Sequence, residues 1–290
     1  VGGASVRLWD ARTGVLLRRL PGRQGVWSPD ARHVATALEG TVTVRDTQTG
    51  EPLKAMHDDH GVWSMRWSPA GPELAVGSAG DAAVRIWDTR DGTLRQVLRP
   101  GPDEIGQMAL PYISWSPDGS RLAVWTGSYV GCWDTATGVR VSRHQFGAPV
   151  AQVEWAPHRH QLLVRTDQHT RIWDLDPDRV ALTLRTPSGN DDDARWSPGG
   201  DLIATLNNLG YLRIWDAGDG GCRLSVRVKP DLLVSECCWS PDGTRVATPH
   251  WDGTIAVWSV HDTIDRLVRR AHDVLPRRLT AAERAEYQLD

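Results

Sequence analysis

The side chains best suited to acid–base chemistry are spread thinly along this 290-residue chain. Asp191, Asp193, Glu236 and His250 are the candidate proton donors and acceptors of an enzyme, since carboxyl and imidazole groups are the usual general acids and bases. Such a role requires a pair of them within hydrogen-bond reach of a common point. The sequence contains no nucleophile elbow, phosphate loop, HExxH motif or dinucleotide fingerprint. We therefore expect a non-catalytic protein and keep an enzyme as the alternative.

Metal and redox chemistry has still less support in the sequence. His158 and His160 lie two residues apart, but no third ligand stands near them. Cys237 and Cys238 are adjacent, so on a strand their side chains point to opposite faces and cannot act as a CxxC pair does. We expect neither a bound metal nor a cofactor.

Tryptophan is the unusual residue of this chain, with 15 copies against 1 Phe and 4 Tyr. One set stands in a Trp-Ser-Pro-like tripeptide at intervals of 40 to 48 residues: Trp27, Trp67, Trp115, Trp155, Trp196 and Trp239. A second set closes an alternating run, usually before an Asp: Trp9, Trp87, Trp133, Trp173, Trp215 and Trp258. In one copy Arg45 takes the Trp position. Two phased series of this kind indicate an internal repeat.

Each repeat carries the signals of four strands. The Trp-Ser-Pro tripeptide is followed by residue pairs such as Asp118-Gly119, which favour a tight turn. A short apolar segment typical of a second strand comes next. A second turn, such as Asp252-Gly253, precedes the alternating run, and one more alternating stretch completes the unit. Four strands in roughly 40–45 residues is the pattern of a propeller blade. The sequence therefore predicts an all-β propeller of four-stranded antiparallel blades.

From residue 1 to 262 the chain resembles the WD-repeat β-propeller family. The resemblance implies a buried network in each blade that joins a Trp, a turn Asp, a Ser or Thr, and a His. Asp81, Asp167 and Asp252 each stand six residues before a Trp and match the Asp position, and Thr248 matches a hydroxyl position. The family's Gly-His dipeptide is missing from every repeat, so we expect an incomplete network. We assign these Asp residues and the Trp residues of the alternating runs structural roles.

The two ends of the chain depart from the repeat. The opening VGGASVRLWD matches a third strand, so we expect residues 1–20 to form half a blade before six repeats, which gives seven blade positions. We also expect an upstream segment that supplies the missing strands and effector domains. Helical spacing of Ile264, Leu267 and Val268 predicts a short helical tail over 263–290, with an outer strand as the alternative for TIDRLVRR. This tail resembles the C-terminal ending of WD-repeat regions in bacterial multidomain signalling ATPases and related regulators.

The composition of the chain limits which classes of partner and which cellular compartment we expect. A formal net charge of −3 gives no general attraction to nucleic acid or to anionic membranes. No apolar run approaches the ~20 residues of a membrane span. Four cysteines without a disulfide pattern favour a reducing compartment, so we expect a cytoplasmic protein. The excess of Arg over Lys is typical of a GC-rich bacterial genome.

Variable loops indicate where recognition occurs. Length varies mainly in the connections from each outer strand to the next inner strand, which the resemblance places on one face together with the Asp-containing turns. Trp63, Tyr112 and Trp251 fall on this face as candidate anchors, with a partial core role as the alternative for Trp63. Its acidic candidates are Asp58, Asp59, Asp103, Glu104, Asp191, Asp192, Asp193 and Glu236.

Short acidic blocks are most often merely solvated, but if they converge they favour a basic peptide. The sequence thus predicts an interaction or sensor scaffold within a larger bacterial signalling protein. Its expected partner is a protein or peptide, not nucleic acid or membrane. The alternative is a propeller enzyme with an acid–base site at the central opening.

Overall fold

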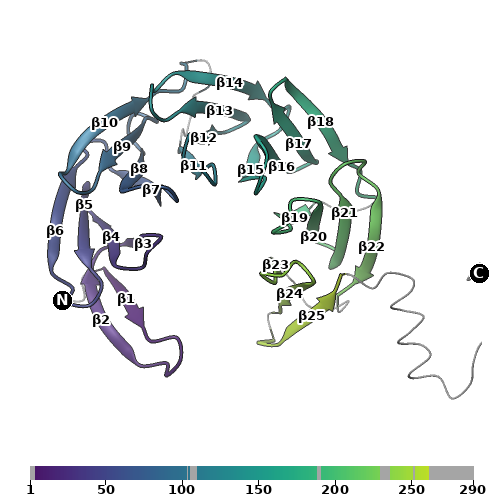
Figure 1. The fold of residues 1–290 in the computed structure, drawn as a ribbon, viewed down its shortest axis with the longest axis horizontal. Coiled ribbons are helices and arrows are strands. Elements are labelled where there is room, and N and C mark those ends of the chain that lie inside the picture. Colours follow the sequence, from purple (N-terminus) through teal and green to yellow (C-terminus); the bar gives the residue numbers. More distant parts are fainter. Residues whose placement is uncertain are drawn as a thin grey trace, which may run out of the picture.

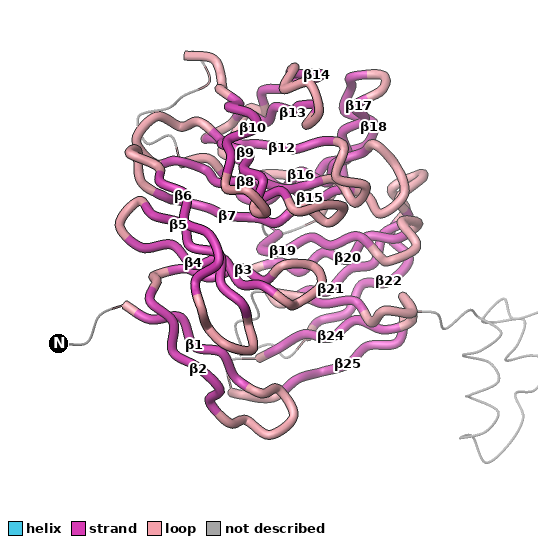
Figure 2. Tube along the Cα trace, turned by 60° about the vertical axis from the view of Figure 1, so that its left-hand side comes forward, coloured by secondary structure: helices cyan, strands magenta, loops and turns pink. Residues whose placement is uncertain are grey.

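The computed structural model describes residues 4–102, 104, 110–187, 191–228, 236–250 and 252–260. These residues form 25 strands joined by loops, and no helix occurs among them (Figure 2). The strands form five four-stranded sheets, one three-stranded sheet and one two-stranded sheet, arranged as blades of an arc (Figure 1). The predicted all-β propeller is confirmed. The expected helical tail, Asp103 and Trp251 lie outside the described residues.

Each blade runs from the centre of the arc outward (Figure 1). The inner strands are β3 (Gln24–Trp27), β7 (Val62–Trp67), β11 (Tyr112–Trp115), β15 (Val150–Trp155), β19 (Asp191–Trp196) and β23 (Cys238–Trp239). The second strands are β4 (His33–Leu38), β8 (Glu73–Ser78), β12 (Arg121–Thr126), β16 (Gln161–Thr166), β20 (Leu202–Asn207) and β24 (Arg245–Pro249). The third strands are β1 (Ser5–Trp9), β5 (Thr41–Asp46), β9 (Val84–Asp88), β13 (Tyr129–Asp134), β17 (Thr170–Leu175), β21 (Tyr211–Asp216) and β25 (Ile255–Ser259). The outer strands are β2 (Leu16–Pro21), β6 (Pro52–His57), β10 (Thr93–Leu98), β14 (Arg140–Gln145), β18 (Asp178–Leu184) and β22 (Cys222–Arg227).

The hydrophobic core lies between neighbouring blades. In β20 all six residues are buried, because another blade covers each face of the sheet, whereas in β22 at the rim most residues are exposed. Val42 and Val44 of β5 pack with Met65, Leu74 and Val76 of the next blade. Apolar side chains from two facing sheets therefore bury one another, as in a sandwich.

The Trp-Ser-Pro turns form as the sequence predicts. The Ser116 hydroxyl donates to the Asp118 carboxylate at 2.6 Å, and the backbone N–H of Arg121 donates to the Ser116 hydroxyl at 2.9 Å. Gly119 closes the turn with φ of +71°. At the equivalent place in the β3–β6 blade Ala31 has φ of +57°, a conformation that a side chain disfavours.

Indole groups connect the inner strands of consecutive blades. In each of these bonds the donor is the indole Nε1 of a Trp-Ser-Pro tryptophan. The acceptor is a backbone carbonyl oxygen of the preceding blade, from the residue just before that blade's own Trp-Ser-Pro tryptophan. These bonds join Trp67 to Val26, Trp115 to Arg66, Trp155 to Ser114 and Trp239 to Arg195, at 2.8 to 3.1 Å. Trp196 departs from the pattern, since its buried Nε1 has no hydrogen-bond partner. The tryptophan ladder therefore fixes the spacing of the blades.

The two ends of the arc differ from its middle. The β1–β2 sheet occupies a third and a fourth strand position and packs on the next blade through Leu8, Leu20 and Val34. The β23–β24–β25 sheet forms the other end, and no strand pairing joins these two sheets. Among the described residues, Trp9 is 53% exposed and Trp27 is 51% exposed.

Candidate protein-interaction face

The connections between blades and the turns between second and third strands lie together on one face, which we call the loop face. Thr126, at the end of β12, donates to the carbonyl oxygen of Glu104 in the β10–β11 connection at 2.9 Å. Thr170, at the start of β17, donates to the carboxylate of Asp191 at 2.7 Å. Both contacts join a connection to a second-to-third-strand turn, in agreement with the expected layout.

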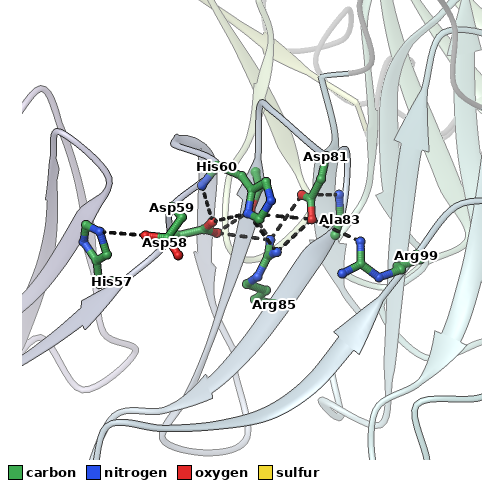
Figure 3. A network of polar contacts seen from close by, with 9 residues as sticks. His57, Asp58, Asp59, His60, Asp81, Ala83, Arg85 and Arg99 are labelled. Atoms are coloured by element: carbon green, nitrogen blue, oxygen red, sulfur yellow. Dashed lines mark hydrogen bonds and ion pairs between the residues drawn. The ribbon is translucent and has the colours of Figure 1, made fainter.

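A polar cluster on the loop face centres on Arg85 of β9 (Figure 3). Its Nη1 atom donates to Ser78 Oγ at 2.6 Å and lies 3.3 Å from Asp58 Oδ2. Ser78 Oγ also donates to Asp58, which follows β6. Asp58 is 3% exposed, so a loss of its cationic partner would leave a buried charge at a cost of about 3–5 kcal/mol. The cluster therefore fixes the β6–β7 connection to its blade.

Asp81, in the β8–β9 turn, completes this cluster. Burial by itself raises the pKa of the Asp81 carboxyl, but hydrogen bonds from Arg85 and from the Ala83 N–H outweigh burial and hold that pKa at about 2. Arg99 donates a further bond to Asp81 at 3.1 Å (Figure 3). Asp81 is thus ionised throughout the physiological range, and its pairing with Arg85 persists. Beside them the His60 side chain lies 3.2 Å from Arg85 and is 45% exposed.

Four of the seven acidic candidates that the structure describes are buried, contrary to the expectation of solvated carboxylates in short acidic blocks. Glu104 is 4% exposed and accepts hydrogen bonds from Arg140 at 2.7 Å and from Arg143 at 2.8 Å. Asp191 is 5% exposed, and burial raises the pKa of its carboxyl despite the hydrogen bond from Thr170. An ion pair or a hydroxyl partner offsets the free-energy cost of burying a charged carboxylate. These carboxylates therefore hold the loops in place.

The remaining acidic candidates divide between burial and exposure. Asp193 is 3% exposed and accepts hydrogen bonds from Arg195 and from the Cys237 N–H, so the expectation of a solvated carboxylate is wrong for it as well. Asp59, Asp192 and Glu236 are exposed. These three carboxylates are the ones that a partner can reach.

Three aromatic side chains gather where the β7–β10 and β11–β14 blades meet. Tyr112 contacts Trp63 edge-on, with ring centroids 5.9 Å apart, and stacks on Trp125 at 5.6 Å. Trp125 is 8% exposed and Trp63 is partly buried, whereas Tyr112 is 44% exposed. Ser64 beside Trp63 donates to the carbonyl oxygen of Pro111 at 2.6 Å and ties the two inner strands together. The structure thus brings two of the three predicted anchors into contact, with Tyr112 as the accessible ring.

The candidate enzyme residues bond to other groups of the fold. Asp191 bonds to Thr170, while His250 lies between Thr248 and Thr254, 3.4 and 3.3 Å from their hydroxyls. No hydrogen bond or ion pair connects any two of Asp191, Asp193, Glu236 and His250 among the residues with described structure.

The histidines expected on the opposite face lie among the inner-to-second-strand turns. His160 lies 4.0 Å from Asp118, which belongs to the same kind of turn in the preceding blade. Within the part of the chain that the structure covers, no group of three His, Cys, Asp or Glu side chains could hold a metal ion. No helix in that part is long and apolar enough to cross a bilayer.

The network implied by the repeat is partial, as the missing Gly-His dipeptide suggests. Trp258 donates to Thr248 at 3.0 Å and Trp215 donates to Thr205 at 2.9 Å, so two blades contain the tryptophan–hydroxyl pair. In the β15–β18 blade Trp173 instead donates to Asp178 at 2.7 Å. Asp167 is exposed, unlike Asp81, and Asp252 accepts the backbone N–H of Thr254 within its own turn.

Sequence reasoning missed two polar groups. Arg85 lies inside an alternating run and drew no separate prediction, although an Arg two residues before a Trp recurs at Arg171 and Arg213 and signals a shared position. Glu154 of β15 was missed too: burial raises the pKa of its carboxyl to about 7, against an attraction from Arg195 that lowers it. Its position directly before a tryptophan gave no signal of this burial.

Comparisons with known proteins agree with this geometry. Residues 50–88 match the family model "WD domain, G-beta repeat", and residues 132–260 match the model "Eukaryotic translation initiation factor eIF2A". "Cell division cycle 20.1, cofactor of APC complex" from Arabidopsis thaliana is 25% identical over 240 residues, which cover 74% of this chain and 50% of that protein. "Small ribosomal subunit protein RACK1y" from Oryza sativa subsp. japonica is 27% identical, over 59% of this chain and 55% of that protein.

A solved structure supports the fold over most of the chain. A chain of the "Crystal Structure of Mitotic Checkpoint Complex" superposes with a TM-score of 0.68 at 21% identity, over 89% of this chain and 82% of that one. This chain spans about half the length of the two curated relatives named above. The phased tryptophans, the four-stranded blades and the superposition identify the fold as a β-propeller, and residues 50–88 within it match the WD-repeat family model.

Proposed function

We propose that this chain is a non-catalytic protein-interaction scaffold that binds a partner protein through its loop face. The main support for this proposal is the aromatic cluster of Trp63, Tyr112 and Trp125. Tyr112 is 44% exposed and lies at the junction of two blades. Tyrosine and tryptophan are the preferred anchors of protein interfaces, because each offers a large rigid surface at a low entropic cost. The buried ion pairs beside this cluster hold the neighbouring loops, which lowers the cost of binding.

The charges that remain accessible support a partner with basic groups. Asp59 is 86% exposed, and Asp192 and Glu236 are exposed too, whereas the other described acidic candidates are buried and hydrogen-bonded within the fold. Exposed rim charges act mainly on the rate of association. The names of the similar proteins refer to assemblies, a cofactor of the APC complex and the mitotic checkpoint complex, which favours a scaffold over an enzyme.

The wider context that we propose is a cytoplasmic bacterial signalling protein with effector domains in the same polypeptide. Its support is the strong preference for Arg over Lys and the resemblance of the 263–290 tail to that class of regulator. In this arrangement the propeller supplies recognition and the effector domains supply activity.

The test uses a photo-crosslinking residue in place of Tyr112 to identify the partner, followed by binding kinetics. Tyr112→Ala should weaken the identified partner by about 2 kcal/mol, or roughly 30-fold. Asp192→Asn should mainly slow association and flatten its salt dependence, because exposed charges act through steering. His158→Ala, on the opposite face, is the matched control and should change neither.

Two outcomes would contradict this proposal. If His158→Ala weakens partner binding and Tyr112→Ala leaves it unchanged, the interface lies on the opposite face. Turnover of a small molecule by the purified protein, abolished by Glu236→Gln without unfolding, would replace the scaffold with an enzyme.

A further inference from the structure

One of the six turns between an inner and a second strand differs from the others in charge. These turns lie on the face opposite the loop face, which we call the turn face. Five of them carry a charged side chain within three residues after their Pro: Asp30, Asp118, Arg159, Asp201 and Asp242. The β7–β8 turn reads Pro69-Ala70-Gly71-Pro72, with Ala70 at the position that Asp30 and Asp118 occupy. This turn therefore adds apolar surface, and no charge of its own, to the turn face.

Two hollows flank the β7–β8 turn. The first has a volume of about 610 Å³ and lies between the β3–β6 and β7–β10 blades, and the second has a volume of about 680 Å³ and lies between the β7–β10 and β11–β14 blades. They share four lining residues: Ala70, Gly71, Pro72 and Arg90. The Thr89 hydroxyl donates to the carbonyl oxygen of Pro72 at 2.6 Å and fixes the turn between them. The two hollows thus form one groove across the β7–β10 blade, which we call the turn-face groove.

The first hollow combines apolar side chains with an unpaired cation. Val44 of β5 and Trp67 of β7 line it, together with Leu53 of β6, which is 48% exposed. Lys54 follows Leu53 on the same strand, is exposed, and forms no ion pair within the part of the chain that the structure covers. Apolar lining with a few polar groups that fix orientation is typical of a binding site. This hollow therefore suits an apolar side chain with a carboxylate beside it.

Arg90 adds a second cation at the boundary of the two hollows. Its guanidinium donates to Asp88 at 2.7 Å, yet its side chain is 71% exposed and can still meet a ligand. Among the described lining residues of the first hollow Asp30 alone is acidic, and it accepts hydrogen bonds from Ser28 and from the Arg32 N–H of its own turn. Positive charge therefore exceeds negative charge in the first hollow.

The second hollow has the opposite balance of charge. Its carboxylates are those of Glu73, Asp88 and Asp118, and its cations are Arg90 and Arg95. Complementary charge at an interface sets the orientation of a ligand and rejects one with like charges in the same places. The groove therefore favours a ligand whose charge changes sign along its length.

We propose that the turn-face groove binds an extended peptide of a partner protein, in which an apolar residue adjoins an acidic one and a basic residue stands further along. The apolar side chain contacts Leu53 and Trp67, the carboxylate meets Lys54, and the basic side chain lies over the second hollow. A phosphate backbone or an anionic bilayer does not fit, because the second hollow repels it. The groove and the loop face lie on opposite sides of the arc, so this site is independent of the loop-face function.

An array of short, terminally blocked peptides tests the required chemistry. Each peptide carries one Leu-Glu pair and one Lys among Gly and Ser residues, at every spacing and in both orders, and a second array exchanges Glu and Lys. We expect the protein to bind members of the first array at a preferred spacing and to bind their exchanged counterparts less tightly. The tightest member, labelled with fluorescein, is then titrated by anisotropy, and its affinity should fall as salt is added because the charged contacts are exposed.

Two variants locate the peptide in the groove. Ala70→Asp supplies the carboxylate that Asp30 and Asp118 carry in equivalent turns, so it is compatible with the fold. This variant should weaken the peptide about tenfold, because the new charge repels the carboxylate of the ligand. Lys54→Glu should weaken it by a similar factor and shift the preference of the protein toward the exchanged array.

Matched controls make the same changes away from both hollows. Gly199→Asp adds an Asp at the equivalent position of the β19–β20 turn, and Arg19→Glu reverses an exposed cation on the outer strand β2. Neither should change the affinity. Tyr112→Ala should leave it unchanged too, so failure of this inference and failure of the loop-face function are separate results.

Three outcomes would overturn the inference. The first is that no member of the first array binds more tightly than its exchanged counterpart. The second is that Ala70→Asp and Lys54→Glu weaken the peptide no more than Gly199→Asp and Arg19→Glu do. The third is dimerisation in sedimentation that Ala70→Asp abolishes, which would assign the groove to a second copy of this chain.

Discussion

Replacing Glu154 with Gln should stabilise the protein in neutral and alkaline solution. Glu154 lies on β15, where burial raises the pKa of its carboxyl from 4.5 to about 7. The attraction of Arg195 and a hydrogen bond from the Trp196 N–H, 3.4 Å from Oε2, only partly offset that burial. A carboxyl whose pKa is raised by folding binds its proton more tightly in the native state, so stability falls as pH rises toward the native pKa.

The magnitude follows from the size of the shift. A difference of about 2.5 pKa units corresponds to about 3 kcal/mol at pH well above 7, an upper limit because the side chain retains some exposure. About 2 kcal/mol of this is lost between about pH 5.5 and about pH 8.5, since the unfolded carboxyl is already ionised across that range while the native one becomes ionised within it. The amide of the Glu154→Gln variant carries no charge, so the variant lacks this loss.

Urea unfolding of both proteins at about pH 5.5 and about pH 8.5 measures the effect. The stability gap between Glu154→Gln and the parent should widen by about 2 kcal/mol on going to the higher pH. All other titrating groups are shared, so the difference between the two proteins isolates Glu154. Equal gaps at the two pH values would show that the carboxyl is not desolvated in the native state.

Three further tests probe the packing and the turns. Trp173→Ala should cost about 3–5 kcal/mol, because this ring is fully buried, while Trp27→Ala should cost far less; equal losses in urea would contradict the burial pattern. Arg85→Met should destabilise the protein by about 3–5 kcal/mol by stranding Asp58, and Asp58→Asn in the same chain should restore part of this in thermal unfolding. Ala31→Gly should raise stability by about 1 kcal/mol in denaturant titrations, since φ is +57° there; a decrease would refute the turn geometry.

The repeat spacing and the turn residues were enough to predict the blade architecture. The spacing of the tryptophans placed the inner and third strands, because the repeat length and the turn residues are properties of the chain itself. The Ser-Pro turns formed as expected at Asp118, since Ser, Asp and Gly favour that turn wherever it stands. The half blade at β1–β2 followed from the phase of the repeat alone.

The acidic residues show where sequence reasoning fails. Asp58 and Asp59 are neighbours in the chain, yet the first is 3% exposed and paired with Arg85 while the second is accessible to solvent. Their identical chemistry cannot reveal which carboxylate meets a guanidinium from a different strand. That pairing depends on the approach of the β6–β7 connection to β9, which only the folded chain establishes.

The tryptophans also separate what the sequence predicts from what only the fold establishes. Trp9 and Trp173 end the same kind of alternating run, and the sequence alone determined that both close a third strand. Only the tertiary structure decided that Trp173 is 0% exposed and Trp9 is 53% exposed. The strand motif is set by residues close in the chain, whereas burial requires a neighbouring blade to cover the ring, and β1 at the end of the arc has no such neighbour on its open side among the described strands.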